Sequence, residues 1–420
     1  MLIYFCLFQI SVHLSKDMTP LAGKYLTASL AALGDRNTVV RKYFASAIGH
    51  LIGIAKESTV NNLFKKLNNY YFDEQSGKSK SIVLTLSAIN KKHADIIKDY
   101  SAVIMPLIFF AKHEEVNDEN KSTVEMWQEL WNDVSFGDSM LQLYLNDIIL
   151  MLETSLNSQS WLLKAQSGSS ISTVAKRLES SLKEEERNRL IELVLNNVSG
   201  RTFNGKERLV EALASLCSKT MTNQEIKNKL IEAVLRECRK EEEIYRTKVL
   251  KSLGEILEKL EEENRFEDVY NMVWVLLDKQ SLKSKDDDAG TSSGNHQTVS
   301  EERNRDKVTL INLKEVVCET LGKAWPNLKA KNSLETQEKY QLMLIVKLTE
   351  VLKVNTRPIQ KSLMVALGLF LQKLHLLNED DNDGEENKEK KHKGSDDDVL
   401  HKICELVMSN VSEAAGNYKR

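Results

Sequence analysis

The chain has 420 residues, of which 41% are hydrophobic and 28% are charged, and its formal net charge is −3. This apolar content is enough for a large buried core and therefore excludes an intrinsically disordered chain. The near balance of 58 basic and 61 acidic residues, with only 6% aromatic residues, argues against nucleic acid as a partner. Only 17 glycines and 4 prolines interrupt the chain, which predicts long helices rather than a turn-rich sheet fold.

The N-terminal stretch, residues 1–16, differs from the rest of the sequence. Residues 1–14 are almost wholly apolar, but they are fewer than the roughly 18 residues that a membrane-spanning helix requires. They also lack the basic start and the small-residue cleavage site of a signal peptide. We therefore interpret residues 1–16 as an atypical apolar helix or a gene-model artefact, and we expect no insertion into a membrane.

A helical pattern begins after this stretch and is clearest around Gly34, where one helix is expected to end. Asp35 and Asn37 can cap the next helix by accepting its free N–H groups. The apolar stripe of that helix consists of Val40, Phe44, Ala47, Ile48 and Leu51. The small Ala45 and Gly49 allow a neighbouring helix to approach closely. This order of features is typical of the second helix of a HEAT repeat.

Variants of this pattern return along the chain and end near Ile89, Ala175, Leu216, Gly254, Gly322 and Gly368. The steps from Gly49 to Ile89, from Ala175 to Leu216, from Leu216 to Gly254 and from Gly322 to Gly368 are about 38 to 46 residues, close to the roughly 40–47 residues of HEAT and armadillo repeats. The longer step from Gly254 to Gly322 falls near 41 residues once the polar residues 281–307 are removed. A single repeat cannot bury its apolar face, so neighbouring repeats must stack. The sequence predicts an all-α, HEAT/ARM-like α-solenoid, a right-handed superhelix of helical hairpins with no sheet. Residues 82–86 alternate like a strand, but their neighbours continue a helix.

Two polar segments divide the repeats. Residues 281–307 are polar, and residues 378–398 hold ten acidic residues against four lysines. Neither segment can bury enough apolar surface to offset the entropy of ordering, so we expect both to be disordered loops. HEAT-like repeats are then expected over residues 17–280 and 308–377. Residues 399–420 are interpreted as the terminal helix of a truncated repeat.

One segment resembles a nucleotide-binding loop. Residues 200–207 match G-x-x-x-x-G-K, but Glu207 stands where the hydroxyl that ligates Mg²⁺ is required, and a helical pattern replaces the preceding strand. We interpret the segment as an inter-repeat turn in which glycines permit unusual backbone angles and Glu207 opens a helix. His401 and Cys404 are the one Cys/His pair at ligand spacing, too few for a zinc site. We therefore predict no catalytic, cofactor-binding or metal-binding residues.

The remaining residues that could carry chemistry are interpreted as structural. We expect His50 to be a partly buried structural histidine. Five tryptophans are expected to lie between helices: Trp127, Trp131, Trp161, Trp274 and Trp325. The pair Trp127 and Trp131, four residues apart on one helix face, has a partner contact as its alternative interpretation. The five cysteines, Cys6, Cys217, Cys238, Cys318 and Cys404, are widely spaced and odd in number, which indicates reduced thiols in a cytosolic protein.

Four parts of the sequence carry a family resemblance. They are residues 34–51, Gln159-Ser160-Trp161 with Lys164-Ala165-Gln166, Gly200-Arg201-Thr202-Phe203 with Gly205-Lys206-Glu207, and Leu321-Gly322-Lys323-Ala324-Trp325-Pro326. In order and spacing they resemble the C-terminal portion of the large HEAT-repeat proteasome adapter and scaffold family, the Ecm-type proteasome component, from about residue 18 to 411. Residues 1–14 do not look like family sequence, and the acidic loops are particular to this chain.

The resemblance implies a non-enzymatic adapter that binds the core and regulatory particles of the proteasome. It also implies a part in proteasome assembly or quality control, and in coupling proteasomes to endoplasmic reticulum, endosomes, motor proteins and ER-associated degradation. The implied location is cytoplasmic, extending to the nucleus and to ER and endosomes through partners. The resemblance assigns no binding site to any residue. The alternative is another HEAT scaffold, such as an importin-class transport receptor or a phosphatase scaffold.

Overall fold

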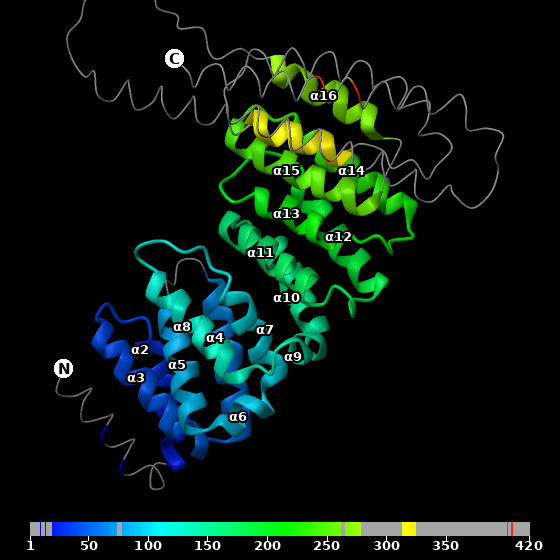
Figure 1. The fold of residues 1–420 in the computed structure, drawn as a ribbon. Coiled ribbons are helices and arrows are strands. Elements are labelled where there is room, and N and C mark those ends of the chain that lie inside the picture. Colours follow the sequence, from blue (N-terminus) through cyan, green and yellow to red (C-terminus); the bar gives the residue numbers. More distant parts are fainter. Residues whose placement is uncertain are drawn as a thin grey trace, which may run out of the picture. The chain divides into compact units, whose positions relative to one another are not determined.

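The computed structural model describes residues 9, 13, 19–73, 78–261, 265–278, 313–324, 401 and 405. The chain divides into two compact units, Met1–Leu216 and Cys217–Arg420. Within the described ranges all regular structure is helical and no strand occurs (Figure 1). The all-α prediction is confirmed there, and residues 82–86 lie within a helix. No helix in the described part of the chain is long and apolar enough to cross a bilayer.

The first unit is a series of helix pairs joined by short turns. Its elements are η1 (Thr19–Leu21), α2 (Ala22–Ala32), α3 (Thr38–Leu51), η2 (Ile52–Ile54), α4 (Glu57–Phe72), α5 (Ser79–Lys92), α6 (Ala94–Asp99), α7 (Ser101–Ala111), α8 (Lys121–Val134), α9 (Asp138–Leu143), α10 (Leu145–Leu156), α11 (Trp161–Arg177), α12 (Glu184–Val198) and α13 (Glu207–Leu216). Helices α2, α4, α7, α10 and α12 pack in succession as one layer. Their partners α3, α5, α8, α11 and α13 cover that layer, with α3 against α5 and α11 against α13.

Helix α3 shows why the sequence pattern predicts the fold. The Oδ1 atom of Asn37 accepts a hydrogen bond from the backbone N–H of Val39 at 2.8 Å and caps the helix. Asp35 serves the turn instead, because its carboxylate accepts the N–H of Asn37 at 2.8 Å. All five residues of the predicted apolar stripe are buried. A Cβ atom at Gly49 would lie 2.8 Å from the carbonyl oxygen of Ala88 in α5, so the close approach expected at this glycine is confirmed.

The second unit continues the same construction. Its described helices are α14 (Gln224–Cys238), α15 (Glu243–Leu260), α16 (Phe266–Asp278) and residues 313–324. Helix α14 packs on α15, and the hydroxyl of Thr320 donates to the carbonyl oxygen of Leu250 at 3.0 Å. The repeat pattern predicted after Gly254 is therefore continued by residues 313–324, which lie against α15.

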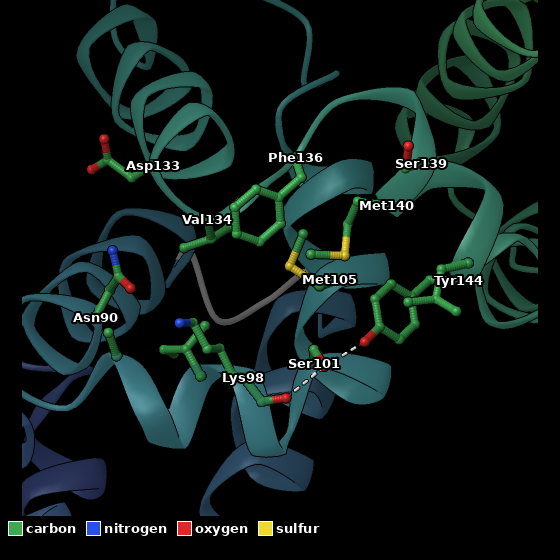
Figure 2. A pocket seen from close by; sticks show the side chains of 13 residues that line it. Asn90, Lys98, Ser101, Met105, Asp133, Val134, Phe136, Ser139, Met140 and Tyr144 are labelled. Atoms are coloured by element: carbon green, nitrogen blue, oxygen red, sulfur yellow. Dashed lines mark hydrogen bonds between the residues drawn. The ribbon is translucent and has the colours of Figure 1, made fainter.

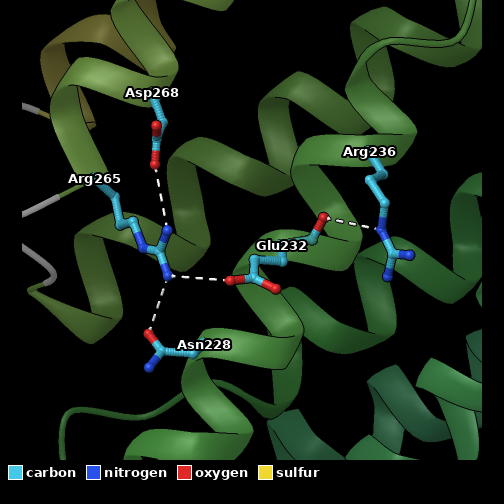
Figure 3. A network of polar contacts seen from close by, with 5 residues as sticks. All are labelled: Asn228, Glu232, Arg236, Arg265 and Asp268. Atoms are coloured by element: carbon cyan, nitrogen blue, oxygen red, sulfur yellow. Dashed lines mark hydrogen bonds and ion pairs between the residues drawn. The ribbon is translucent and has the colours of Figure 1, made fainter.

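A polar network joins α14 to the start of α16 (Figure 3). The guanidinium of Arg265 donates to Asn228 at 3.2 Å and to Asp268 at 3.3 Å. It also lies 3.6 Å from a carboxylate oxygen of Glu232. These pairs are partly exposed, so they fix the direction of α16 more than they add to stability.

The described cysteines, Cys217, Cys238 and Cys318, are buried free thiols, as predicted. Burial raises the pKa of the Cys318 thiol to about 12, so this thiol stays protonated and unreactive. Several predictions fall outside the described residues: Cys6, Cys404 and Trp325, the side chain of Trp274, nearly all of residues 1–16 and 399–420, and residues 281–307 and 378–398.

Candidate functional site

Two of the sequence strings that carry the family resemblance meet on one surface of the first unit. Trp161, the first residue of α11, stacks on Phe203 with ring centroids 4.6 Å apart and an interplanar angle of 28°. Ser160 caps the helix by accepting the N–H of Leu163 at 3.3 Å. The prediction that Trp161 lies between helices is wrong, because its side chain is 54% exposed. It is the first residue of α11, and besides Phe203 of the turn its ring faces the Lys164 amine of the same helix, 5.7 Å from the ring centroid.

That turn, residues 199–206, has the backbone expected from its glycines. Gly200 has a φ of 101° and Gly205 a φ of 89°, both in the region that favours glycine. A Cβ atom at Gly205 would lie 2.7 Å from the Cβ of Ala165, so glycine also permits the turn to press against α11. Helix α13 begins at Glu207. The interpretation of this segment as an inter-repeat turn is confirmed.

Lys206 is the feature of this turn that the sequence did not reveal. Its side chain is fully buried, and its amine donates a hydrogen bond to the carbonyl oxygen of Gly200 at 3.2 Å. A buried amine requires polar partners, and this bond supplies one of them while it closes the turn. The lysine that completes the G-x-x-x-x-G-K match thus points into its own turn.

Helices α11 and α13 approach more closely than side chains would allow. A Cβ at Gly168 would lie 2.7 Å from the carbonyl carbon and oxygen of Arg208. Arg208 in turn forms an ion pair with Glu115 at 3.0 Å, which ties α13 to the loop after α7. Turn, helix and loop are therefore held together around the exposed Trp161.

A polar network lies beneath this surface. Glu114 Oε1 accepts the hydroxyl of Tyr71 at 2.8 Å and the hydroxyl of Ser79 at 2.6 Å. Gln166 of α11 donates to the Tyr71 oxygen at 2.8 Å, and the indole N–H of Trp127 donates to Ser79 at 3.0 Å. Burial raises the pKa of Tyr71 well above its usual value, and the nearby Glu114 charge raises it further. Burial also raises the pKa of Glu114, against the two hydrogen bonds that lower it.

The surface and the network border a pocket of about 740 Å³. Its lining residues come from α4, α5, the loop after α7, α11 and the glycine turn: Tyr71, Asp73, Lys78, Ser79, Glu114, Glu115, Val116, Asn117, Asn120, Ser160, Leu162, Leu163, Gln166 and Asn204. Leu162 is 67% exposed and Val116 57%. Trp161 and Phe203 do not line the pocket, but they are the sequence neighbours of the lining residues Leu162 and Asn204, so the aromatic stack lies beside it. We call this pocket, together with the adjoining rim that carries the stack, the motif surface.

Trp127 and Trp131 are both buried in α8, so their placement between helices is confirmed and the alternative of a partner contact is wrong. The Lys112 amine lies 4.4 Å from the Trp131 ring centroid. Beside it, His113 faces the carbonyl oxygen of Phe109 at 2.8 Å through Nδ1 and the hydroxyl of Thr173 at 2.8 Å through Nε2.

These contacts leave His113 nearly enclosed. Burial, more than the neighbouring Lys112 charge, lowers the pKa of His113 to about 4. Because a carbonyl oxygen can only accept, the neutral ring carries its proton on Nδ1. His50 is half-buried in α3 and burial lowers its pKa, which confirms it as a partly buried histidine.

A second pocket, of about 620 Å³, lies among α6, α7, α9 and residues 134–136 (Figure 2). Met105 and Met140 line it, and the side chains of Phe136 and Leu143 are 77% and 69% exposed at its edge. One wall is fixed by the hydrogen bond between the hydroxyls of Ser101 and Tyr144 at 2.5 Å. No sequence motif marked this pocket, because its residues come from helices that the repeat pattern did not identify.

Two family models match this chain. The HEAT-repeat domain of the proteasome adapter and scaffold protein ECM29 matches residues 6–72, and the C-terminal ARM-like repeats of ECM29 match residues 213–415. The chain belongs to the ECM29 family. The first match begins at residue 6, so the view that residues 1–14 are unlike the family is wrong from that residue onward.

Relatives of known identity agree with the ECM29 assignment. The chain is 47% identical over 416 residues to the Drosophila melanogaster proteasome-associated protein ECM29 homolog, covering 97% of this chain and 22% of that protein. It is 35% identical over 385 residues to the Homo sapiens proteasome adapter and scaffold protein ECM29, covering 88% of this chain and 20% of that protein. The chain thus spans about a fifth of the length of these relatives.

Among solved structures, a crystal structure of importin beta is similar over 86% of this chain and 48% of that chain, with a TM-score of 0.36 and 15% identity. This likeness carries no functional argument. Family membership instead sets aside the importin-class and phosphatase-scaffold alternatives, because the two matches identify ECM29 specifically.

Proposed function

We propose that this chain is part of a non-enzymatic adapter and scaffold that binds proteasomes. One observation carries the proposal: 97% of the chain aligns at 47% identity with a proteasome-associated protein. The fold supports it, because stacked helix pairs expose a long continuous surface on which a large assembly can be bound. The motif surface supports it as well, because an exposed tryptophan beside a pocket is a common anchor of protein interfaces.

The finer roles in this proposal follow from the same family resemblance. They are a part in proteasome assembly or quality control, and the coupling of proteasomes to ER and endosomal membranes, motor proteins and ER-associated degradation. The proposed location is cytoplasmic, extending to the nucleus and, through partners, to these membranes. In a membrane flotation gradient, proteasomes that co-migrate with the membrane fraction only when the chain is present would support the coupling role.

The direct test is affinity purification of the tagged full chain from cells, followed by mass spectrometry and by binding to purified proteasomes. We expect subunits of both the core and the regulatory particle to be recovered. A similarly tagged importin is the matched control, because it shares the solenoid architecture without the family sequence. Recovery of Ran or phosphatase subunits in place of proteasome subunits would contradict the proposal.

A further inference from the structure

Only one of the two carboxylate oxygens of Glu114 accepts hydrogen bonds from the described residues. Oε1 accepts both hydrogen bonds, from Tyr71 at 2.8 Å and from Ser79 at 2.6 Å. Among the described residues no donor bonds Oε2, although the side chain lines the 740 Å³ pocket. Burial raises the pKa of Glu114, because the charged carboxylate is less well solvated in the pocket than in water. An incoming cation would supply that missing stabilisation.

The charges that line the pocket are predominantly negative. Asp73, Glu114 and Glu115 are acidic, and Lys78 is the basic lining residue. The Lys78 amine lies 3.8 Å from the ring centroid of Tyr70, and the Glu115 carboxylate is paired with Arg208 at 3.0 Å. Each of these charges therefore has a partner, whereas one oxygen of Glu114 remains to accept a donor from the pocket.

The rim of the same pocket is apolar. Leu162 is 67% exposed, Val116 is 57% exposed, and Trp161 is 54% exposed while stacked on Phe203. These exposed apolar side chains are not part of the buried core of the unit. The turn that carries Phe203 is closed by the hydrogen bond from the buried Lys206 to the carbonyl oxygen of Gly200. Exposed aromatic groups next to a polar pocket are typical of interaction sites.

We propose that the motif surface binds a segment of a partner protein that carries an apolar side chain beside an arginine or lysine. The apolar side chain packs on Trp161 and Leu162 at the rim, and the basic group enters the pocket and donates to Glu114 Oε2. Charge complementarity selects this occupant, since an acidic segment would face the carboxylates of Asp73 and Glu114 beside the already paired Glu115. This inference rests on the proposed function in one respect: the partner is taken to be a proteasome subunit.

The test compares four single variants of the full chain in binding to purified proteasomes. Glu114→Gln keeps an acceptor for Tyr71 and Ser79 but removes the charge, and Leu162→Ser removes apolar surface that is already exposed. The controls are Glu129→Gln, an exposed acid on α8, and Leu150→Ser, a side chain 54% exposed on α10. We expect at least about a tenfold loss of affinity for the first two variants and no loss for the controls. Circular dichroism melting checks that all four fold.

A second measurement separates this inference from the proposed function. Short fluorescent peptides with one leucine and one arginine are titrated against the chain, beside peptides in which glutamate replaces the arginine. Preference for arginine that disappears in Glu114→Gln supports the inference even if proteasomes do not bind. Equal proteasome binding by all four variants, or peptide binding indifferent to the arginine, overturns it. If the wild-type chain fails to bind proteasomes while the arginine preference holds, the proposed function alone is contradicted.

Discussion

In two helix contacts of the first unit a glycine permits close approach of the neighbouring helix, but the surroundings of the two glycines differ. Gly49 of α3 allows α5 to approach until a Cβ would lie 2.8 Å from the carbonyl oxygen of Ala88, and Gly168 of α11 does the same against Arg208 at 2.7 Å. The first contact packs α3 on α5, and beside it the Ser81 hydroxyl of α5 donates a buried hydrogen bond to the carbonyl oxygen of Leu33 at 2.9 Å. The second adds a glycine turn, a buried lysine and an exposed aromatic stack, none of which helix packing requires. Both contacts therefore belong to the repeat architecture, whereas only the second also contributes to the motif surface.

The largest expected effect concerns His113, which holds α7 to α11 through Thr173. Its pKa in the folded chain is about 4, below the ordinary 6.5, so the unfolded chain takes up a proton over that interval and the folded chain does not. This contribution to stability is complete above about pH 6.5 and is lost as the pH falls toward 4, by up to about 3 kcal/mol. Chemical denaturation across this interval should show a shallower acid loss for His113→Gln than for wild type. Identical pH profiles would contradict the assignment.

The second effect tests whether the two glycine contacts are equivalent. Alanine at Gly168 or at Gly49 would force backbone apart, and each substitution should destabilise the unit by about 2 kcal/mol despite the higher helix propensity of alanine. Gly23 is the matched control, because a Cβ there would lie 3.6 Å from the Thr59 hydroxyl in ordinary contact. Gly23→Ala should be neutral or slightly stabilising. Thermal melting of the three variants measures this, and a Gly168→Ala variant as stable as Gly23→Ala would refute the close contact.

The smallest effect on stability is expected at the exposed end of α11. Trp161→Ala removes a side chain that is 54% exposed, and we expect a loss below about 1 kcal/mol, chiefly from the stack on Phe203. Proteasome affinity should fall much more than stability. A stability loss as large as that of Gly168→Ala would show that the aromatic stack belongs to the packing rather than to the surface.

The sequence predicted the architecture well where a helix has one apolar face. The cap at Asn37 and the buried stripe of α3 follow directly from residue order. Helix α7 is different, because residues 104–111 are all buried and it contains Pro106, so it shows neither a stripe nor a start signal. The sequence pattern therefore did not identify the helix pair of α7 and α8. For the same reason it did not predict the pocket among α6, α7 and α9.

The sequence did not predict the motif surface. The strings around Trp161 and Phe203 were singled out, yet their meeting was not foreseen because it joins residues about 40 positions apart. Lys206 is buried although lysine is usually exposed. The sequence feature that accompanies this burial is the pair Gly200 and Gly205 in the same turn. The Glu114 network unites α4, α5, α8 and α11 over long sequence separations, which no local pattern encodes.

Site-specific photo-crosslinking tests the central claim most directly. A photoreactive amino acid placed at Leu162, on the motif surface, is compared with one at Leu150, an exposed side chain of α10. With purified proteasomes, position 162 should crosslink to one subunit at an apolar segment that contains a lysine or arginine, and position 150 should not. Proteasomes that bind without crosslinking at 162, or that crosslink equally at both positions, would contradict the account.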